Sequence, residues 1–302
     1  MNASKRVLIA YLLLSTSALT WGGNLTVGRF IHGEIAPGTL SLLRWSVALL
    51  ILLPLTYRAL HRQRALVRAH WRFIAMLGLT GVTLFHTFVY LSLSLTPTIN
   101  AALLFTIAPI VIVVFSWVLF RERISRRQVA GIVASLVGAL LIATRGDPRV
   151  ALALEFNRGD MFMLIAIPNW ALYSVLLRRR PKAIEPLVLL VTTIMMGLAC
   201  QIPIALWEVI DGRVPTITVG SVLSVLYVGV FAGVVAYLCW NRGVAEIGAN
   251  RAGLFLHLVP VFGAGFAVVF LDESIFAFHL NGAACIAVGI YLSTSRAPLA
   301  TR

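Results

Sequence analysis

Long hydrophobic runs, separated by short polar segments, dominate the pattern of the chain. Each run has about the length of a membrane-crossing helix, which needs on the order of 20 residues to cross the hydrocarbon core. Ten runs are predicted as spans, and because their connections are short, neighbouring helices are expected to pack antiparallel. The predicted spans cover residues 7–31, 37–57, 71–95, 97–120, 129–144, 161–177, 186–208, 219–242, 249–271 and 277–294.

The composition agrees with this pattern. Hydrophobic residues make up 60% of the chain and charged residues 12%, whereas soluble domains carry about 25% charged residues. The fold class predicted is therefore an all-α polytopic membrane protein. Its three cysteines lie in apolar runs without metal-ligand spacing, and no cofactor or metal is expected.

The second half of the chain repeats the first. A shift of 151 residues aligns Pro109 with Pro260, and a shift of 149 residues aligns Trp21 with Trp170. Residues 1–148 and 149–302 are therefore predicted to be two five-helix repeats. Because the first run matches a mid-chain span, it is interpreted as a span and not as a signal peptide. Further matches at the shift of 151 are Ala101/Ala252, Glu122/Glu273, Gly131/Gly282, Gly138/Gly289 and Arg145/Arg296.

The net charge of +14 reflects topology. If the N-terminus is cytoplasmic, 19 of the 25 Lys and Arg residues fall in or beside cytoplasmic segments. The positive-inside rule then predicts that both termini are cytoplasmic. The basic excess is explained without a nucleic-acid site.

An odd number of spans per repeat requires the repeats to be inverted in the membrane. The loop RERISRR (121–127) and its counterpart LDESIF (271–276) accordingly differ in charge. Inverted repeats are typical of alternating-access transporters, whose substrate site lies near the midplane between the halves.

Four segments carry a specific resemblance: WGGN (21–24), LRWSVALLILLP (43–54), APIVIVVFSWVLFRERI (108–124) and VPVFGAGFAVVFLDESI (259–275). They resemble the drug/metabolite transporter superfamily, and within it the EamA-type ten-helix exporters. The chain as a whole is most similar to the YddG-type exporters of aromatic amino acids. The resemblance implies a basket-like bundle around a central cavity, and export of amino acids or other metabolites across the cytoplasmic (inner) membrane.

Polar and aromatic residues inside the spans are the candidates for substrate binding, because a polar side chain in a bilayer is expected to face a cavity. Aromatic walls with few polar anchors suit a large neutral amino acid. The alternatives are that Trp and Tyr form interfacial belts and that the histidines bond to neighbouring helices. The candidates are Trp21, Asn24, His86, Tyr90, Asn169, Trp170, Tyr173, Tyr237, Trp240 and His257.

Other residues within the spans have structural or mechanical interpretations. Pro109 and Pro260 each remove a backbone donor, and they are predicted to be hinges, with static kinks as the alternative. The paired glycines of spans five and ten predict close helix packing; both a monomer and a homodimer are compatible with them. Arg44 is expected to be either an anchor of the fold or a contact for a substrate carboxylate.

Competing function classes find little support. An enzyme would need Asp-rich diphosphate sites, an HExxH motif or a Ser/His pair, and none is present. Another solute class, such as a drug, a sugar phosphate, a nucleotide sugar or a lipid-linked sugar, remains the alternative. Since no Asp or Glu lies inside a span, concentration-driven transport is expected; proton exchange through His86 or His257 is its alternative.

Overall fold

The computed structural model describes residues 3–30, 33–153, 155–271 and 274–294. All regular secondary structure in this part of the chain is helical, and ten of its helical segments are long and apolar enough to cross a membrane. The predicted fold class is thereby confirmed. The repeat matches at Glu273 and Arg296, and the acidic pair of the loop 271–276, lie outside the described residues.

Six spans are continuous helices. One of them, α10, continues into a 3₁₀ turn, η2 (Leu177–Arg179). Short helices α3 (Arg64–Ala69) and α9 (Pro148–Leu152) lie in the connections. The six are α1 (Ala3–Phe30), α2 (Pro37–Arg62), α8 (Arg126–Ala143), α10 (Arg158–Leu176), α11 (Pro186–Ile210) and α16 (Ala277–Thr294).

The other four spans are interrupted, and the interruptions come at matching places in the two halves. The third span has a π-helical segment between two α-helices, and so has the eighth. The fourth span breaks at residues 106–107, and the ninth passes through a 3₁₀ segment. Their parts are α4 (Trp71–Gly78), η1 (Leu79–Leu84) and α5 (Phe85–Leu95); α6 (Thr98–Phe105) and α7 (Ala108–Phe120); α12 (Val219–Tyr227), η3 (Val228–Val235) and α13 (Ala236–Ile247); and α14 (Ala249–Gly253), η4 (Leu254–His257) and α15 (Leu258–Leu271).

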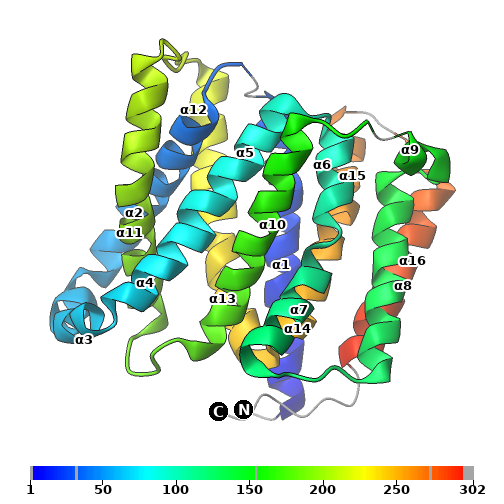
Figure 1. Cartoon of the computed structure of the whole chain (residues 1–302), viewed down its shortest axis with the longest axis horizontal. Helices are drawn as coiled ribbons and strands as arrows, with labels where there is room; N and C mark the ends of the chain where they lie inside the picture. The colour runs from blue at the N-terminus through cyan, green and yellow to red at the C-terminus, as the bar shows by residue number, and fades with distance from the viewer. Residues whose placement is uncertain (1–2, 31–32, 154, 272–273, 295–302) are drawn as a thin grey trace.

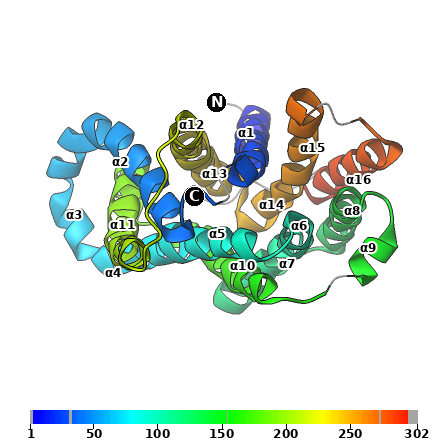
Figure 2. The same ribbon diagram turned by 90° about the horizontal axis from the view of Figure 1, so that it is seen from above.

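The bundle has two ends. Helix α1 begins and α16 ends at the lower edge of Figure 1, which also holds the turn from α7 to α8; we call this end the terminal face. The turns from α5 to α6 and from α11 to α12 lie at the other end, the opposite face. Seen from above, α5, α6 and α10 form one row and α12, α13, α1 and α15 another, with α2 and α11 at one side and α8 and α16 at the other (Figure 2).

Glycine pairs hold α8 and α16 together. A Cβ atom at Gly131 would lie 2.5 Å from the carbonyl oxygen of Gly289, and one at Gly289 would lie 2.5 Å from that of Gly131. Gly138 and Gly282 face each other in the same way. The predicted close packing of spans five and ten is confirmed, and no residue of α8 or α16 lines the cavity described below.

A buried carboxylate anchors α2 at the opposite face. Glu208, near the end of α11, accepts hydrogen bonds from the backbone N–H groups of Gly38 (2.9 Å) and Thr39 (2.7 Å). These donors belong to the first turn of α2, where no intrahelical acceptor exists and a negative charge is favourable. The contact fixes the N-terminus of α2. It therefore also helps to position Arg44, which lies two turns further along the helix.

Candidate functional site

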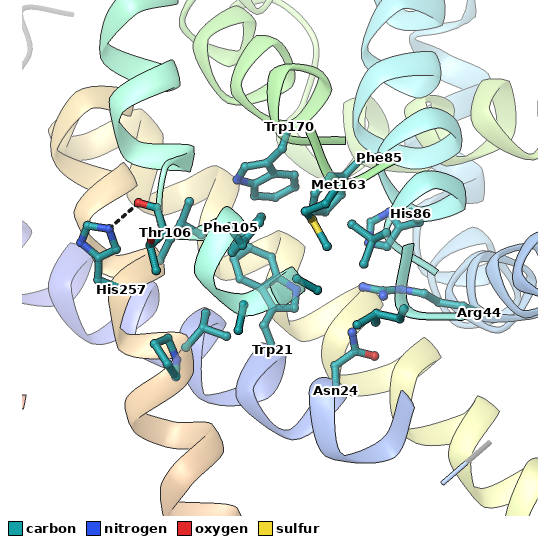
Figure 3. A pocket seen from close by; sticks show the side chains of 17 residues that line it. Trp21, Asn24, Arg44, Phe85, His86, Phe105, Thr106, Met163, Trp170 and His257 are labelled. Carbon is teal, nitrogen blue, oxygen red and sulfur yellow. Dashed lines mark hydrogen bonds between the residues drawn. The ribbon is translucent and has the colours of Figure 1, made fainter. Parts of the chain in front are cut away.

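A cavity of about 90 Å³ lies between the two rows of helices. Six of the residues predicted from the sequence line it, namely Trp21, Asn24, His86, Trp170, His257 and the hinge candidate Pro260. Figure 3 shows Trp21 and Asn24 of α1, His86 of α5, Trp170 of α10 and His257 of the ninth span around this cavity. The remaining lining residues are Arg44, Phe85, Val89, Leu93, Ala101, Ala102, Phe105, Thr106, Met163, Leu256 and Val259.

Two tryptophans from equivalent positions meet at the centre of the cavity. The rings of Trp21 and Trp170 lie edge to face with centroids 5.2 Å apart. Phe85 packs against Trp170 with a centroid distance of 4.8 Å. Such aromatic contacts fix ring orientation and provide apolar surface for a ligand.

Three other predicted residues close the cavity towards the terminal face and do not line it. Tyr173, Tyr237 and Trp240 are at most 1% exposed, and their rings pack against Trp170. The Tyr173 hydroxyl donates to Asn241 Oδ1 (2.8 Å). Trp240 Nε1 donates to Ser174 Oγ (3.3 Å). These residues precede the ends of α10 and α13 at the terminal face, so they form a buried plug on that side.

Ionic contacts lie beyond this plug. Glu122, in the turn after α7, forms an ion pair with Arg178. The same carboxylate accepts a hydrogen bond from Asn250 Nδ2 of α14 (3.1 Å). Spans four, six and nine are thus joined at the terminal face.

Two predicted residues lie elsewhere. Asn169 Nδ2 donates to the carbonyl oxygen of Ile165 in its own helix (2.8 Å), and Asn169 does not line the cavity. Tyr90 lines a second depression, of about 450 Å³, which lies at the opposite face. Leu93 lines both spaces, so the depression borders the cavity on that side.

Arg44 stands between the cavity and this depression. Its side chain is 0% exposed, and its Nη1 donates to the Tyr90 hydroxyl (2.9 Å). Its Nη2 donates to the carbonyl oxygen of Ala232 (2.6 Å), and its guanidinium lies 5.3 Å from the Trp45 ring centroid. Among the described residues no carboxylate pairs with it, and no Asp or Glu lines the cavity.

The π-helical segments supply the carbonyl groups that hold these side chains. Ala232 lies in η3, and its carbonyl oxygen accepts from both Arg44 Nη2 and Trp21 Nε1 (3.2 Å). Gly81 lies 151 residues earlier, in η1, and its carbonyl oxygen accepts from the Tyr237 hydroxyl (2.5 Å). A π-helical turn changes the backbone hydrogen-bond register, which leaves such carbonyl groups for side chains.

Several polar atoms at the cavity have no hydrogen-bond partner within the described part of the chain. They are Asn24 Oδ1, Arg44 Nε, His86 Nδ1 and Trp170 Nε1. Buried polar groups are nearly always paired, so a group of unpaired atoms requires an explanation. All four residues line one cavity, where a polar ligand or ordered water can pair with these atoms.

The two helix breaks meet beside the cavity. The carbonyl oxygen of Thr106 lies 2.9 Å from His257 Nε2, which donates to it because a carbonyl oxygen only accepts. In the neutral ring, Ser135 Oγ then donates to Nδ1 (2.6 Å). Pro109 lies in the first turn of α7, directly after one break, and Pro260 lies in the first turn of α15, directly after the other. His257, a predicted site residue, therefore joins both breaks to α8.

The chain belongs to the EamA-like transporter family, whose model matches it twice, at residues 8–144 and 157–295. It is similar to "Uncharacterized transporter YyaM" of Bacillus subtilis (strain 168), with 27% identity over 282 residues, 93% of this chain and 92% of that protein. A "Probable amino-acid metabolite efflux pump" of Salmonella typhimurium is 27% identical over 183 residues, 58% of this chain and 60% of that protein. A solved structure described only as "Crystal structure of protein" shares the fold, with a TM-score of 0.75, 22% identity and 96% of each chain covered. The protein is therefore a multi-pass membrane transporter.

Proposed function

We propose that the protein exports amino acids with aromatic or other large neutral side chains across the cytoplasmic (inner) membrane by alternating access. The observation that carries this proposal is Arg44, a buried cation at the cavity with an unpaired Nε and no carboxylate partner among the described residues. A buried charge is expensive unless it is paired. A substrate carboxylate would complete its pairing, while Trp21, Phe85 and Trp170 would pack against the apolar side chain.

The distribution of basic residues predicts how the protein is oriented in the membrane. Clustered arginines follow α2, α7 and α10 at the terminal face, so that face is cytoplasmic under the positive-inside rule. The plug of Tyr173, Tyr237 and Trp240 then closes the cytoplasmic side, and the larger depression opens to the outside. Two inverted repeats, residues 1–148 and 149–302, would exchange these roles during transport.

The cavity has to widen to hold a substrate. Ligand pockets usually measure about 300–1,000 Å³, whereas this one measures about 90 Å³. The helix breaks before Pro109 and Pro260 are where the fourth and ninth spans would bend to make room. Their contact through Thr106 and His257 (2.9 Å) couples the two movements.

A carrier of sugar phosphates or nucleotide sugars is less well supported. Such substrates bring two or more negative charges, and charge-assisted pairs with several basic groups would be needed to bind them. Among the described residues, one arginine lines the cavity. The name of the Salmonella protein, an amino-acid metabolite efflux pump, points to the same choice.

Transport into proteoliposomes tests the proposal. Purified protein is reconstituted, and counterflow of labelled phenylalanine is measured against a panel of unlabelled competitors. We expect tryptophan, tyrosine and leucine to compete, and aspartate, lysine and glucose 6-phosphate not to. Counterflow of glucose 6-phosphate without counterflow of phenylalanine would replace the proposal with the sugar-phosphate carrier.

A further inference from the structure

We propose that Asn24 Oδ1 accepts a hydrogen bond from the ammonium group of the substrate, so that Asn24 selects amino acids over carboxylic acids of the same shape. This inference rests on the proposed function and names the group by which the same cavity distinguishes its substrates. The argument starts from the few acceptors that the cavity contains.

Asn24 is placed to meet a ligand. It lies on α1 three residues after Trp21, on the same face of the helix. Its side chain and that of Arg44 point into the same end of the cavity (Figure 3). Its Oδ1 is buried and has no hydrogen-bond partner among the described residues. A buried amide oxygen left in this state is unfavourable unless a donor arrives.

The cavity offers an ammonium group few other acceptors. None of the described residues that line it is Asp or Glu. The Thr106 carbonyl oxygen already accepts from His257 (2.9 Å), and the Thr106 hydroxyl donates to Leu103 (2.6 Å). Both Thr106 oxygens keep a free lone pair but already have one partner each, whereas the amide oxygen of Asn24 has none among the described residues. The face of the neighbouring Trp21 ring is a further favourable surface for a cation.

Arg44 and Asn24 together match a zwitterion. Two guanidinium nitrogens of Arg44 are held by Tyr90 and Ala232, which leaves its unpaired Nε to meet a carboxylate. In an α-amino acid the ammonium and carboxylate groups are attached to the same carbon atom. Two anchors at one end of the cavity therefore suit an amino acid, with its side chain directed towards Trp170.

His86 is the rival for this role. Its Nδ1 is also buried without a partner in the described part of the chain. Its ring, however, is packed edge-on against Trp45 at 5.2 Å and Phe85 at 4.8 Å. A substitution at His86 therefore belongs in the same experiment.

The test compares phenylalanine with 3-phenylpropionate, which keeps the ring and the carboxylate and replaces the ammonium group with hydrogen. Dissociation constants are measured by isothermal titration calorimetry on the purified protein. We expect the wild type to bind phenylalanine more tightly by about tenfold, the effect of one hydrogen bond to a charged group. Asn24→Leu, which is similar in size, should reduce this ratio to about one. It should leave the affinity for 3-phenylpropionate unchanged, and Asn24→Asp should keep or increase the preference for phenylalanine.

The controls separate the possible failures. Asn281→Leu changes an exposed asparagine of α16 and should leave the ratio unchanged. If Asn24→Leu weakens both ligands equally, or if His86→Leu removes the preference and Asn24→Leu does not, Asn24 does not read the ammonium group. If wild-type protein binds neither ligand, the proposed function itself is wrong and this inference is wrong with it.

Discussion

At the two ends of the cavity, equivalent positions of the two repeats carry the same two residue types, but their hydrogen bonding differs. The shifts between the repeats place Asn24 on Tyr173 and Tyr90 on Asn241, so each half has one asparagine and one tyrosine at these positions. On the terminal side, Tyr173 donates to Asn241 (2.8 Å) and the pair is closed. On the opposite side, the Tyr90 hydroxyl accepts from Arg44 (2.9 Å), and Asn24 Oδ1 is unpaired.

The difference between the ends depends on one charge. The residue equivalent to Arg44 at the shift of 149 is Thr193, which is neutral and 1% exposed. The second half can therefore close on itself, whereas the first half keeps a cation and an unpaired acceptor. The two repeats thus form a hydrogen-bonded plug at one end, and at the other end the cation and unpaired acceptor on which the proposed ligand site depends.

The largest effect is expected from a topology experiment, because the comparison requires the two ends to lie on opposite sides of the membrane. Ser125 and Ser274 are exposed and occupy equivalent loops. In a background without Cys200, Cys239 and Cys285, single cysteines at these positions should react with an impermeant reagent from opposite sides. Labelling of both from one side would contradict the inverted arrangement.

Arg44→Leu should come next, because it removes the charge from the end of the cavity that holds Asn24. A lost charge-assisted contact of about 3 kcal/mol lowers substrate affinity by about 100-fold. Arg44→Lys should be intermediate, since lysine lacks the planar fork. Counterflow in proteoliposomes gives the measurement, with Arg149→Leu on the exposed α9 as the control. Near-normal counterflow by Arg44→Leu would leave Arg44 with a structural role alone.

The sequence predicted the ten spans well, because long apolar runs have few other solutions. It also predicted that Trp21 and Trp170 face one cavity, since both halves place a tryptophan at the equivalent position; the contact between their rings is an observation of the structure. Asn169 was predicted to line the same cavity, yet its side chain donates a hydrogen bond to Ile165 of its own helix. Consecutive residues on a helix do not share a face. The position of Asn169 directly before Trp170 therefore already implied that the two side chains point in different directions.

Other features of the site could not be predicted from any short stretch of the sequence. The π-helical segments, whose Gly81 and Ala232 carbonyl groups accept from side chains of other spans, follow from no sequence pattern identified above. Whether Arg44 had a carboxylate partner depended on which helices came together, and the chain order does not reveal this. Tyr237 and Trp240 were predicted to bind substrate in the cavity, but they lie in the plug and not in the cavity wall, which is decided by how the helices pack.

Removing the aromatic wall between the two ends should have a smaller effect than removing the charge. Trp170→Ala and Trp21→Ala should each weaken substrate binding by about 1–2 kcal/mol, which is roughly 5- to 30-fold. Equilibrium binding of phenylalanine provides the measurement, and Trp207→Ala, which is 60% exposed at the end of α11, is the matched control. Unchanged affinity in both variants would place the binding surface elsewhere.

Tyr173→Phe tests the closed end. It deletes one hydrogen bond, worth about 1 kcal/mol, and should favour opening of the plug by about fivefold. A cysteine at the buried Ser174, in the cysteine-free background, reports this opening through its labelling rate from the terminal face. Tyr57→Phe alters an exposed tyrosine and serves as the control. If the labelling rate stays at that of the control, the hydrogen bond between Tyr173 and Asn241 does not hold the plug closed.

The smallest effect is expected from a proton gradient. The described acidic residues lie in loops or at the ends of spans, where Glu208 caps α2 and Asp160 accepts from Thr96 (2.7 Å). Inside the spans, His257 already uses both ring nitrogens in hydrogen bonds to Thr106 and Ser135. A carrier that exchanged one proton per substrate would gain about 1.4 kcal/mol, a tenfold accumulation, for each pH unit. We therefore expect labelled phenylalanine to reach equal concentrations inside and outside proteoliposomes, with or without a pH gradient. If movement stalls without the gradient and resumes when it is imposed, the protein is a proton antiporter, and His86 and His257 are the first residues to substitute.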